Sequence, residues 1–568
     1  MKYYLVGIKG SGMAALACIL KDLGYEVTGV DKKDYLFTQE KLIKKGIVVE
    51  DFSNYCFDDA DIIVVGNAFL DTIDLYKGKE TITYQEMVSI IASKYYSIAV
   101  CGTHGKTTTS NMIRHVLSKI DEVGYLIGDG TGKAQKNSKY FVFEACEHRK
   151  HFLSYFPDII VATNIDYDHV DYYQSKKKYK EAFYSFFKHA KDKLIINSNI
   201  KYKTKHSSFG YKKGNVYAKN IEFLQKGTKF DLIINDKEYK EVFLPIFGKH
   251  MLENVLACIA CMDALKININ QAIDILKQYE NASRRYNSKQ INSNVIIDDY
   301  GHHPKEIKST ILAIKQQYVD KKIIVIYHPD RPKRITCFHQ EFINAFKKVD
   351  KVYLLPFINH KKEEENAIIS LLDNKKIVRF SDDLFINKYE NTVFLFTGSK
   401  DMKNIIEKLT LILWYNYNIE GDNMKFAISA CLVGDNTKYN GGNNYNKELV
   451  EFLKDKEYIT ICPEVLGGLS TPRSPSEKKD GKVINKEGKD VTANFINGAI
   501  KAKELLKDVD VVIVKSNSPS CGKGKIYDGT FNNKLVDGNG VFVDMIIKEN
   551  IKIFTEKQLD EIKKLCEN

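Results

Sequence analysis

The chain has 568 residues, of which 44% are hydrophobic and 28% charged, and its formal net charge is +12. This composition is typical of a folded globular protein, and the length predicts about four domains of ~150 residues each. No apolar run approaches the ~18 residues that a membrane span needs, so we expect no such segment. The positive charges are spread along the chain, which favours a lysine-rich surface over a specific nucleic-acid interface.

The opening residues M-K-Y-Y-L-V-G-I indicate a strand rather than a secretion signal, so we expect a cytoplasmic protein. Eleven cysteines in a chain of this length do not describe a disulfide framework. Cys258 and Cys261 form a C-x-x-C, but the surrounding pattern is helical. We interpret the pair as one face of a buried helix rather than as a metal site.

Residues 1–93 are predicted to form a small α/β domain with a Rossmann-like start. A strand at Tyr3–Gly7 leads into G-I-K-G-S-G-M, an apolar helix and a second strand at Glu26–Val30. The glycine spacing does not fit G-x-G-x-x-G, so we expect the loop to bind the diphosphate of a nucleotide other than a dinucleotide. The candidate binding residues are Gly7, Gly10, Ser11, Gly12, Met13 and Asp31.

Residues 94–290 are predicted to form a parallel sheet that carries a phosphate-binding loop. The strand Ser97–Cys101 runs into G-T-H-G-K-T-T-T and a helix, and glycines there let successive N–H groups face an anion at a helix N-terminus. Lys106 can reach terminal phosphates and the Thr107 hydroxyl can bind magnesium. An ordinary glycine turn is the alternative, but the flanking strand and helix favour ATP or GTP binding. The candidate nucleotide-binding residues are Gly102, Thr103, His104, Gly105, Lys106, Thr107 and Thr108.

Further polar residues follow other strands of this predicted sheet. Glu144 ends the strand F-V-F-E, where a carboxylate can hold magnesium at the phosphates. T-N-I-D-Y-D-H-V-D, at 163–171, ends the next strand, and its aspartates are the ligands that magnesium prefers, although some can cap the following helix. Asn254 lies four residues after His250 on a predicted helix, and in isolation such residues are more often a cap and a structural polar group.

Residues 291–415 are predicted to form a third α/β domain. Its first strand ends in D-D-Y-G-H-H-P, at 298–304, and this density of polar groups in a loop after a strand is hard to explain by packing. Residues 416–423 are expected to be a polar linker. A fourth domain is expected at 424–568.

Taken in order, G-I-K-G-S-G-M, G-T-H-G-K-T-T-T, E-A-C-E-H-R-K-H-F-L, T-N-I-D-Y-D-H-V-D-Y, R-R-Y and D-D-Y-G-H-H-P resemble motifs of the Mur ligase family, in particular its UDP-N-acetylmuramate–L-alanine ligases. The resemblance covers residues 1–415 and implies a three-domain Mur ligase fold, ATP and Mg²⁺ as cofactors, and the joining of L-alanine to UDP-N-acetylmuramate through an acyl phosphate. It also implies that Glu144 and His169 bind magnesium, that Asn254 lies near the nucleotide, and that the loop from Gly7 to Met13 receives the UDP-sugar. Lys106, Arg285 and His302 would act on the reacting groups.

One segment departs from the family pattern. The usual Q-P-H-x-x-S-R reads H-P-D-R-P-K-R at 328–334, and the usual G-A-G-D reads G-S-K-D at 398–401. Arg331 and Arg334 remain candidates for phosphate contact, but Asp330 replaces the histidine. An altered substrate, weakened activity and a non-catalytic nucleotide or UDP-sugar binder are the alternatives that this change leaves open, together with a ligase that recycles whole peptides.

In the fourth domain, three cysteines each follow an apolar strand, beside glycine or proline. Cys431, Cys462 and Cys521 are therefore placed to converge, and three thiolates suit zinc or an iron–sulfur cluster with one open position. S-A-C-L-V-G, C-P-E, D-V-T and S-P-S-C-G resemble the thiouracil desulfidase family, a small α/β domain. That resemblance implies an iron–sulfur cluster on the three cysteines and a thiolated pyrimidine as substrate.

Glu464 is a candidate acid/base and Ser518 a candidate proton relay in this domain. The alternatives are a salt bridge for Glu464, in which Arg473 pairs with a carboxylate, and a cap for Ser518. The domain as a whole could instead be a redox sensor of the ligase.

Overall fold

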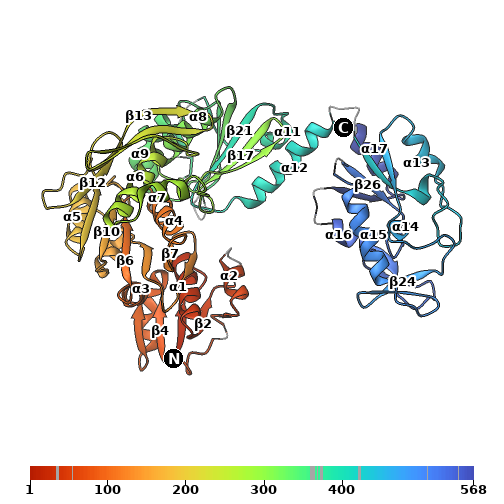
Figure 1. The fold of residues 1–568 in the computed structure, drawn as a ribbon, viewed down its shortest axis with the longest axis horizontal. Helices are drawn as coiled ribbons and strands as arrows, with labels where there is room; N and C mark the ends of the chain where they lie inside the picture. The colour runs from red at the N-terminus through yellow and green to blue at the C-terminus, as the bar shows by residue number, and fades with distance from the viewer. Residues whose placement is uncertain are drawn as a thin grey trace. The chain divides into compact units, whose positions relative to one another are not determined.

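The computed structural model of the chain describes residues 1–33, 38–53, 55–357, 365–366, 369–370, 372, 375–419, 424–507, 509–547, 549 and 551–567. The chain divides into two compact units, Met1–Glu407 and Lys408–Asn568. Each unit is an α/β structure built on parallel strands (Figure 1).

The first unit begins with a five-stranded parallel sheet in the order β3-β2-β1-β4-β5. This order places β1 at the centre, with the glycine loop at its carboxyl end, and confirms the Rossmann-like start. The apolar helix α1 (Ser11–Asp22) is buried on all sides from Met13 to Leu20. The strands are β1 (Lys2–Val6), β2 (Glu26–Asp31), β3 (Val48–Asp51), β4 (Ile62–Val65) and β5 (Glu80–Thr83), and the other helices are α2 (Gln39–Lys44), η1 (Asn67–Tyr76) and α3 (Tyr84–Ala92).

A ten-stranded sheet follows, in the order β15-β14-β13-β12-β11-β10-β6-β9-β7-β8. Its centre is parallel, and β6 lies between β9 and β10 as expected for a strand that carries a binding loop. The strands are β6 (Tyr96–Cys101), β7 (Val123–Ile127), β8 (Thr131–Lys133), β9 (Tyr140–Glu144), β10 (Ile159–Ala162), β11 (Lys193–Asn197), β12 (Ser207–Gly210), β13 (Val216–Leu224), β14 (Gly227–Ile234) and β15 (Lys237–Leu244).

The predicted parallel sheet is confirmed at its centre, but both edges contain antiparallel strands that the sequence analysis did not predict. Strands β13, β14 and β15 form an antiparallel meander, and β8 pairs antiparallel with β7. Two-residue turns at Gln225–Lys226 and Asn235–Asp236 join the meander strands, and such short links allow only antiparallel pairing. The helices of this part are α4 (Lys106–Leu117), η2 (His148–Ser154), α5 (Lys176–Phe187), α6 (Lys249–Ala264) and α7 (Ile269–Leu276).

The third sheet has the order β16-β17-β21-β18-β19-β20, and all pairs except β16 with β17 are parallel. Its strands are β16 (Asn287–Ile291), β17 (Asn294–Asp299), β18 (Lys322–Tyr327), β19 (Lys351–Leu354), β20 (Ile377–Arg379) and β21 (Thr392–Thr397). The helices are α8 (Pro304–Gln317), α9 (Pro332–Phe346), α11 (Asp383–Ile386) and α12 (Lys403–Ile419).

Helix α12 continues into the segment expected to be a linker. Leu409 and Leu413 of this helix are buried, and their spacing of one helical turn extends the helical pattern. Residues 416–419 are therefore helical, whereas 420–423 lie outside the described residues.

The second unit has a four-stranded parallel sheet in the order β23-β22-β26-β29 and two small hairpins. Its strands are β22 (Phe426–Ser429), β23 (Tyr458–Ile461), β24 (Ser476–Lys479), β25 (Lys482–Asn485), β26 (Val511–Val514), β27 (Lys525–Tyr527), β28 (Leu535–Asp537) and β29 (Lys552–Thr555). The helices are η3 (Ala430–Val433), α13 (Lys447–Phe452), α14 (Pro463–Leu466), α15 (Thr492–Glu504), α16 (Val541–Ile546) and α17 (Leu559–Glu567).

Two sequence expectations about apolar segments can be compared with this fold. Cys258 and Cys261 lie inside α6 with no exposed surface, which confirms the interpretation as a buried helix face. Among the helices in the described part of the chain, none combines the length and the apolar character that crossing a membrane requires.

Candidate functional site

The loop between β6 and α4 has the backbone of a phosphate-binding loop. Gly102 and Gly105 have φ values of 140° and 80°, which favour glycine. Any side chain at Gly102 would collide with the Thr163 hydroxyl, and one at Gly105 would collide with the Asn254 amide. Asn254 thus lies against the loop, where its Oδ1 also accepts a hydrogen bond from Thr109 Oγ1 at 3.3 Å.

Lys106 is held at this loop by a carboxylate that the sequence analysis did not single out. Its Nζ lies 2.9 Å from Glu147 Oε2 and 3.2 Å from the carbonyl oxygen of Thr103. Burial alone would lower the pKa of Lys106, but Glu147, Cys146 and Glu144 together outweigh it and the pKa is raised. Burial likewise opposes ionisation of Glu147, yet Lys106 and His169 bring the pKa of that carboxyl to about 2. Glu147 is the second glutamate of E-A-C-E, and its position in that motif was the only signal for it.

The two expected magnesium ligands Glu144 and His169 lie at different places around the loop. Thr107 Oγ1 lies 3.2 Å from Glu144 Oε2, so these two oxygen groups form one pair. His169, with a φ of 52°, instead directs Nε2 to Glu147 Oε1 at 3.4 Å. Arg285 joins the first pair, since its Nη2 donates to Thr107 Oγ1 at 3.1 Å.

The oxygen pair of Thr107 and Glu144 fits a magnesium ion, because Mg²⁺ prefers oxygen ligands and keeps several waters of its own. Burial raises the pKa of Glu144, so this carboxylate would gain from a cation beside it. Within the described ranges, no group of three or more His, Cys, Asp or Glu side chains is gathered for a metal ion.

The aspartates after β10 form ion pairs with the third domain of the first unit. Arg334 Nη2 lies 3.1 Å from Asp168 Oδ2, and both side chains are less than a tenth exposed. Asp166 pairs with Lys305, and Asp171 with Arg331 at 3.0 Å. In this structure these carboxylates therefore join two segments of the chain, and their role as magnesium ligands stays a prediction.

Arg334 is consequently not free to contact phosphate in this structure. Its Nη1 donates to Asp330 Oδ1 at 2.7 Å while its other nitrogens hold Asp168. Asp330 also accepts from Ser399 Oγ at 2.9 Å. The aspartate that departs from the family pattern thus serves as a second carboxylate for a buried guanidinium.

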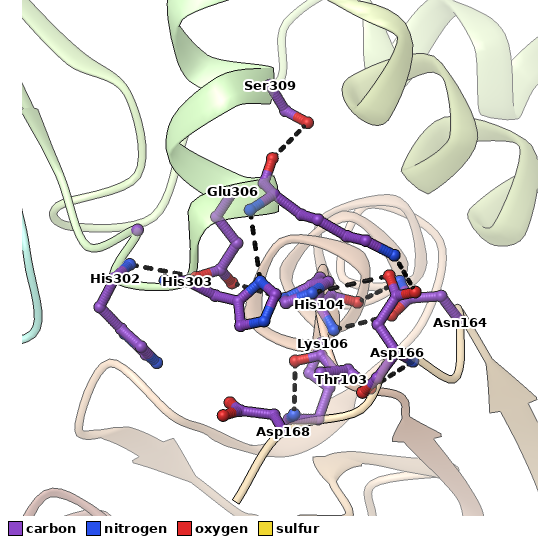
Figure 2. A network of polar contacts seen from close by, with 12 residues as sticks. Thr103, His104, Lys106, Asn164, Asp166, Asp168, His302, His303, Glu306 and Ser309 are labelled. Carbon is purple, nitrogen blue, oxygen red and sulfur yellow. Dashed lines mark hydrogen bonds and ion pairs between the residues drawn. The ribbon is translucent and has the colours of Figure 1, made fainter. Parts of the chain in front are cut away.

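His302 and His104 meet around a single glutamate, as Figure 2 shows. Glu306 Oε2 accepts from the backbone N–H of His302 at 3.1 Å, and Glu306 Oε1 lies 3.1 Å from His104 Nδ1. Burial lowers the pKa of His302. A cavity of about 800 Å³ opens beside this network and is large enough for a nucleotide. Its lining includes His104, Gly105, Thr108, Asn254, Arg285 and Glu306.

The glycine loop after β1 is a tight turn. Gly7 has a φ of 80°, and any side chain there would collide with Phe69. Ser11 and Gly12 open α1, and Met13 is buried against Gly66. Gly10 donates to the Gly7 carbonyl oxygen at 3.1 Å.

Asp31, at the end of β2, is already engaged within the fold. Its Oδ2 accepts from the Lys9 backbone N–H at 2.7 Å, and its Oδ1 from that of Lys32 at 2.8 Å. In this structure Asp31 therefore stabilises the glycine loop through its hydrogen bond with Lys9.

In the second unit, the three cysteine thiols influence one another. Burial is the main reason that the pKa values of Cys431 and Cys521 are raised, and each is raised further by Cys462. Asn444 Nδ2 lies 3.4 Å from Cys431 Sγ and can donate to it. The three thiols therefore lie close enough to interact electrostatically with one another.

Glu464 and Ser518 have structural partners in this unit. Arg473 Nε donates to Glu464 Oε2 at 2.9 Å, the salt bridge that was the alternative for this glutamate. Ser518 Oγ accepts from the backbone N–H groups of Ser520 and Cys521, both at 3.1 Å, which is the capping alternative. The turn that carries Cys521 is therefore fixed by Ser518.

Three family models cover the first unit. Residues 2–96 match the Mur ligase family catalytic domain, 100–262 the Mur ligase middle domain, and 284–399 the Mur ligase glutamate ligase domain. The chain belongs to the Mur ligase family. Residues 426–558 of this Mur ligase match the 2-thiouracil desulfurase model, so a desulfurase-type domain follows the ligase domains.

Solved structures share the fold of the Mur ligase part. The UDP-N-acetylmuramate-alanine ligase of Thermotoga maritima is 24% identical, with a TM-score of 0.61, over 74% of this chain and 99% of that one. A murein peptide ligase of Psychrobacter arcticus is 22% identical, with a TM-score of 0.53, over 73% and 99%. A 4Fe–4S-dependent thiouracil desulfidase is 35% identical over 25% of this chain and 96% of that one, with a TM-score of 0.23.

Proposed function

We propose that the Mur ligase part joins L-alanine to UDP-N-acetylmuramate at the expense of ATP. The observation that carries this proposal is the contact between Arg285 Nη2 and Thr107 Oγ1 at 3.1 Å. It brings a cationic side chain from the start of the segment that matches the Mur ligase glutamate ligase domain onto the phosphate loop, beside Lys106. A site with two cations on a phosphate loop suits transfer of a phosphoryl group to a second substrate.

The reaction begins when the muramate carboxylate attacks the γ-phosphorus of ATP, which releases ADP and forms an acyl phosphate. The amine of alanine then attacks the acyl carbon, loses a proton and displaces phosphate. Lys106 and Arg285 would neutralise the negative charge that develops in both steps. A magnesium ion held by Thr107 and Glu144 would add charge neutralisation at the phosphates.

The roles of the remaining candidates follow from their positions. Gly102 to Thr108 would hold the phosphates, with Asn254 beside them, and the loop at Gly7 to Met13 would receive the UDP-sugar. His302, whose backbone shares Glu306 with His104, would orient the reacting groups. Arg331, with its exposed partner Asp171, can leave that pair for a phosphate at small cost, whereas Arg334 would act through the ion pairs that it already makes.

The test is phosphate release from ATP with UDP-N-acetylmuramate, with and without L-alanine. We expect alanine-dependent release that is lost in Lys106→Ala. Release that depends on a tripeptide and not on alanine would assign the site to peptide recycling. No release with either amine, together with tight nucleotide binding, would identify a non-catalytic binder.

We also propose that the second unit removes sulfur from a thiolated pyrimidine. Cys431, Cys462 and Cys521 would hold an iron–sulfur cluster, which would supply an iron that accepts the substrate sulfur. Glu464, whose pKa is raised mainly by burial, could pass a proton to the leaving group or from the incoming water. Anaerobic reconstitution of the full chain, followed by conversion of thiouracil to uracil, tests this proposal. An effect of cluster oxidation on phosphate release, with no conversion of thiouracil, would instead show a redox sensor.

A further inference from the structure

Glu306 makes two different connections with its two carboxylate oxygens. Oε2 accepts from the backbone N–H groups of His302 and His303, at 3.1 and 3.2 Å, and so caps the start of α8. Oε1 lies 3.1 Å from Nδ1 of His104, a residue of the phosphate loop more than 200 positions earlier in the chain. One partly buried side chain thus joins the loop that carries His302 to the loop that carries Lys106 (Figure 2).

The backbone of His104 is also held by Thr163 and Asn164 of the middle domain. Its N–H donates to Asn164 Oδ1 at 2.9 Å, and its carbonyl accepts from Thr163 Oγ1 at 2.6 Å and from Asn164 Nδ2 at 2.9 Å. The imidazole therefore extends from a rigid point of the middle domain. Its ring lies 4.8 Å from that of His303, so it is also packed against the turn that Glu306 caps.

The surrounding charges favour this connection. Asp166, whose Oδ2 is 3.7 Å from His104 Nε2, lies on the side of the imidazole away from Glu306. Lys305, next to Glu306, pairs with Asp166 and so forms a second link between the start of α8 and the loop after β10. The partly buried imidazole therefore lies between two carboxylates, with Glu306 within hydrogen-bonding distance and Asp166 farther away.

We propose that Glu306 is a positioning residue for phosphoryl transfer. Through His104 it positions the phosphate loop, and through the backbone N–H of His302 it positions the loop that precedes α8. Glu306 thereby keeps these two loops in a fixed position relative to each other. This inference rests on the proposed ligase function, because the relative position of these loops matters only if a phosphoryl group passes between substrates bound at them. Misplacement of reacting groups by about 1 Å can lower turnover by about a hundredfold.

The test separates the two connections of Glu306. In Glu306→Gln, the amide oxygen can still cap α8, but the neutral side chain no longer holds the imidazole with a carboxylate. His104→Gln removes the other partner, and the double variant completes a cycle. Lys308→Ala, an exposed side chain on the same helix, is the matched control.

The first readout is hydrogen exchange of the full-length protein without substrates. We expect Glu306→Gln to raise exchange in the peptide covering 102–107 by about threefold or more, with α8 unchanged. Unchanged exchange in that peptide would overturn the proposal, and this result does not depend on any activity. The control should leave both peptides as in the wild type.

The second readout is the kinetics of phosphate release. We expect each single variant to lower kcat about tenfold or more, and we expect Glu306→Gln to leave the Kd for ATP within about twofold, because Lys106 and the glycines of the loop are unchanged. The double variant should be no slower than the slower single variant. Multiplied effects would overturn the coupling of the two residues. A wild type without turnover would refute the proposed function, whereas the exchange readout would still decide whether Glu306 connects the loops.

Discussion

Lys106 Nζ and Glu147 Oε2 form an ion pair of 2.9 Å, with the glutamate side chain only 1% exposed. The pair occupies the phosphate loop, where the ammonium would meet the phosphates of ATP. Binding of ATP must therefore offer Lys106 a second anion beside the one that it already has.

Glu147→Gln should destabilise the nucleotide-free protein by about 3–5 kcal/mol, because it leaves a buried ammonium without its partner. ATP should restore more stability to this variant than to the wild type, since its phosphates replace the missing charge. Thermal unfolding with and without ATP measures both effects. Glu181→Gln, in an exposed pair, is the control and should behave as the wild type. Equal stabilisation by ATP in variant and wild type would contradict this account.

Two adjacent arginines should show different defects. Arg285→Ala removes the guanidinium on Thr107 and should lower kcat for phosphate release by about 10²–10³, as for other groups that stabilise developing charge. Arg284→Ala removes donors to the Gly398 and Lys400 carbonyls and should lower stability first. Steady-state kinetics and calorimetry on both variants separate the two roles. A stability loss without a kinetic defect in Arg285→Ala would count against its proposed role.

The ion pairs that link β10 to α9 should differ in strength according to burial. Arg334→Met leaves Asp168 and Asp330 without their shared cation and should cost about 3–5 kcal/mol. Arg331→Met, whose pair with Asp171 is about two-fifths exposed, should cost less than about 1 kcal/mol. Urea unfolding of the two variants gives the comparison. Similar losses for both would show that burial does not govern these pairs.

His303 should make the ligase unit less stable in acid. Burial is the main cause that lowers the pKa of His303 to about 3 from its ordinary value near 6.5. Between these values the unfolded chain binds a proton that the folded chain does not, so stability falls as the pH drops from 6.5 towards 3, by up to about 1.4 kcal/mol per pH unit. His303 Nδ1 also accepts from the Lys305 N–H at 3.3 Å, a bond that protonation would remove.

His303→Asn keeps a capping acceptor and removes the titrating group. Its calorimetric stability should therefore change less between pH 6.5 and pH 4.5 than that of the wild type. The transition that ATP shifts identifies the ligase unit in such scans. An unchanged pH slope would mean that other groups account for the acid sensitivity.

Cys521→Ser should prevent stable loading of an iron–sulfur cluster. The thiol is buried at a turn fixed by Ser518 Oγ, so a neighbouring cysteine cannot replace it without rebuilding the turn. Iron and sulfide bound after anaerobic reconstitution should fall to less than about a tenth of the wild-type content. Cys337→Ser, an exposed cysteine of the first unit, should load normally. Full loading of Cys521→Ser would remove this residue from the ligand set.

Local sequence patterns predicted most of the central strands. The apolar segments that became β6, β10, β18 and β21 are buried on both faces of parallel sheets, and such strands read as short continuous hydrophobic runs. The meander β13–β15 was missed because its residues alternate between buried and exposed and include many charges. Its strands are defined by pairing with each other rather than by an apolar run.

The sequence by itself determined the phosphate loop, since Gly102, Gly105, Lys106 and Thr107 act within one strand–turn–helix segment whose backbone is set locally. It also determined the order of the domains and the three cysteine-bearing strand ends. Only the tertiary structure decided that Lys106 lies on Glu147, that His104 meets Glu306, and that Arg334 pairs with Asp168. The physical reason is that charged side chains choose partners by distance and burial, and chain folding brings together residues that are from 41 to more than 200 positions apart.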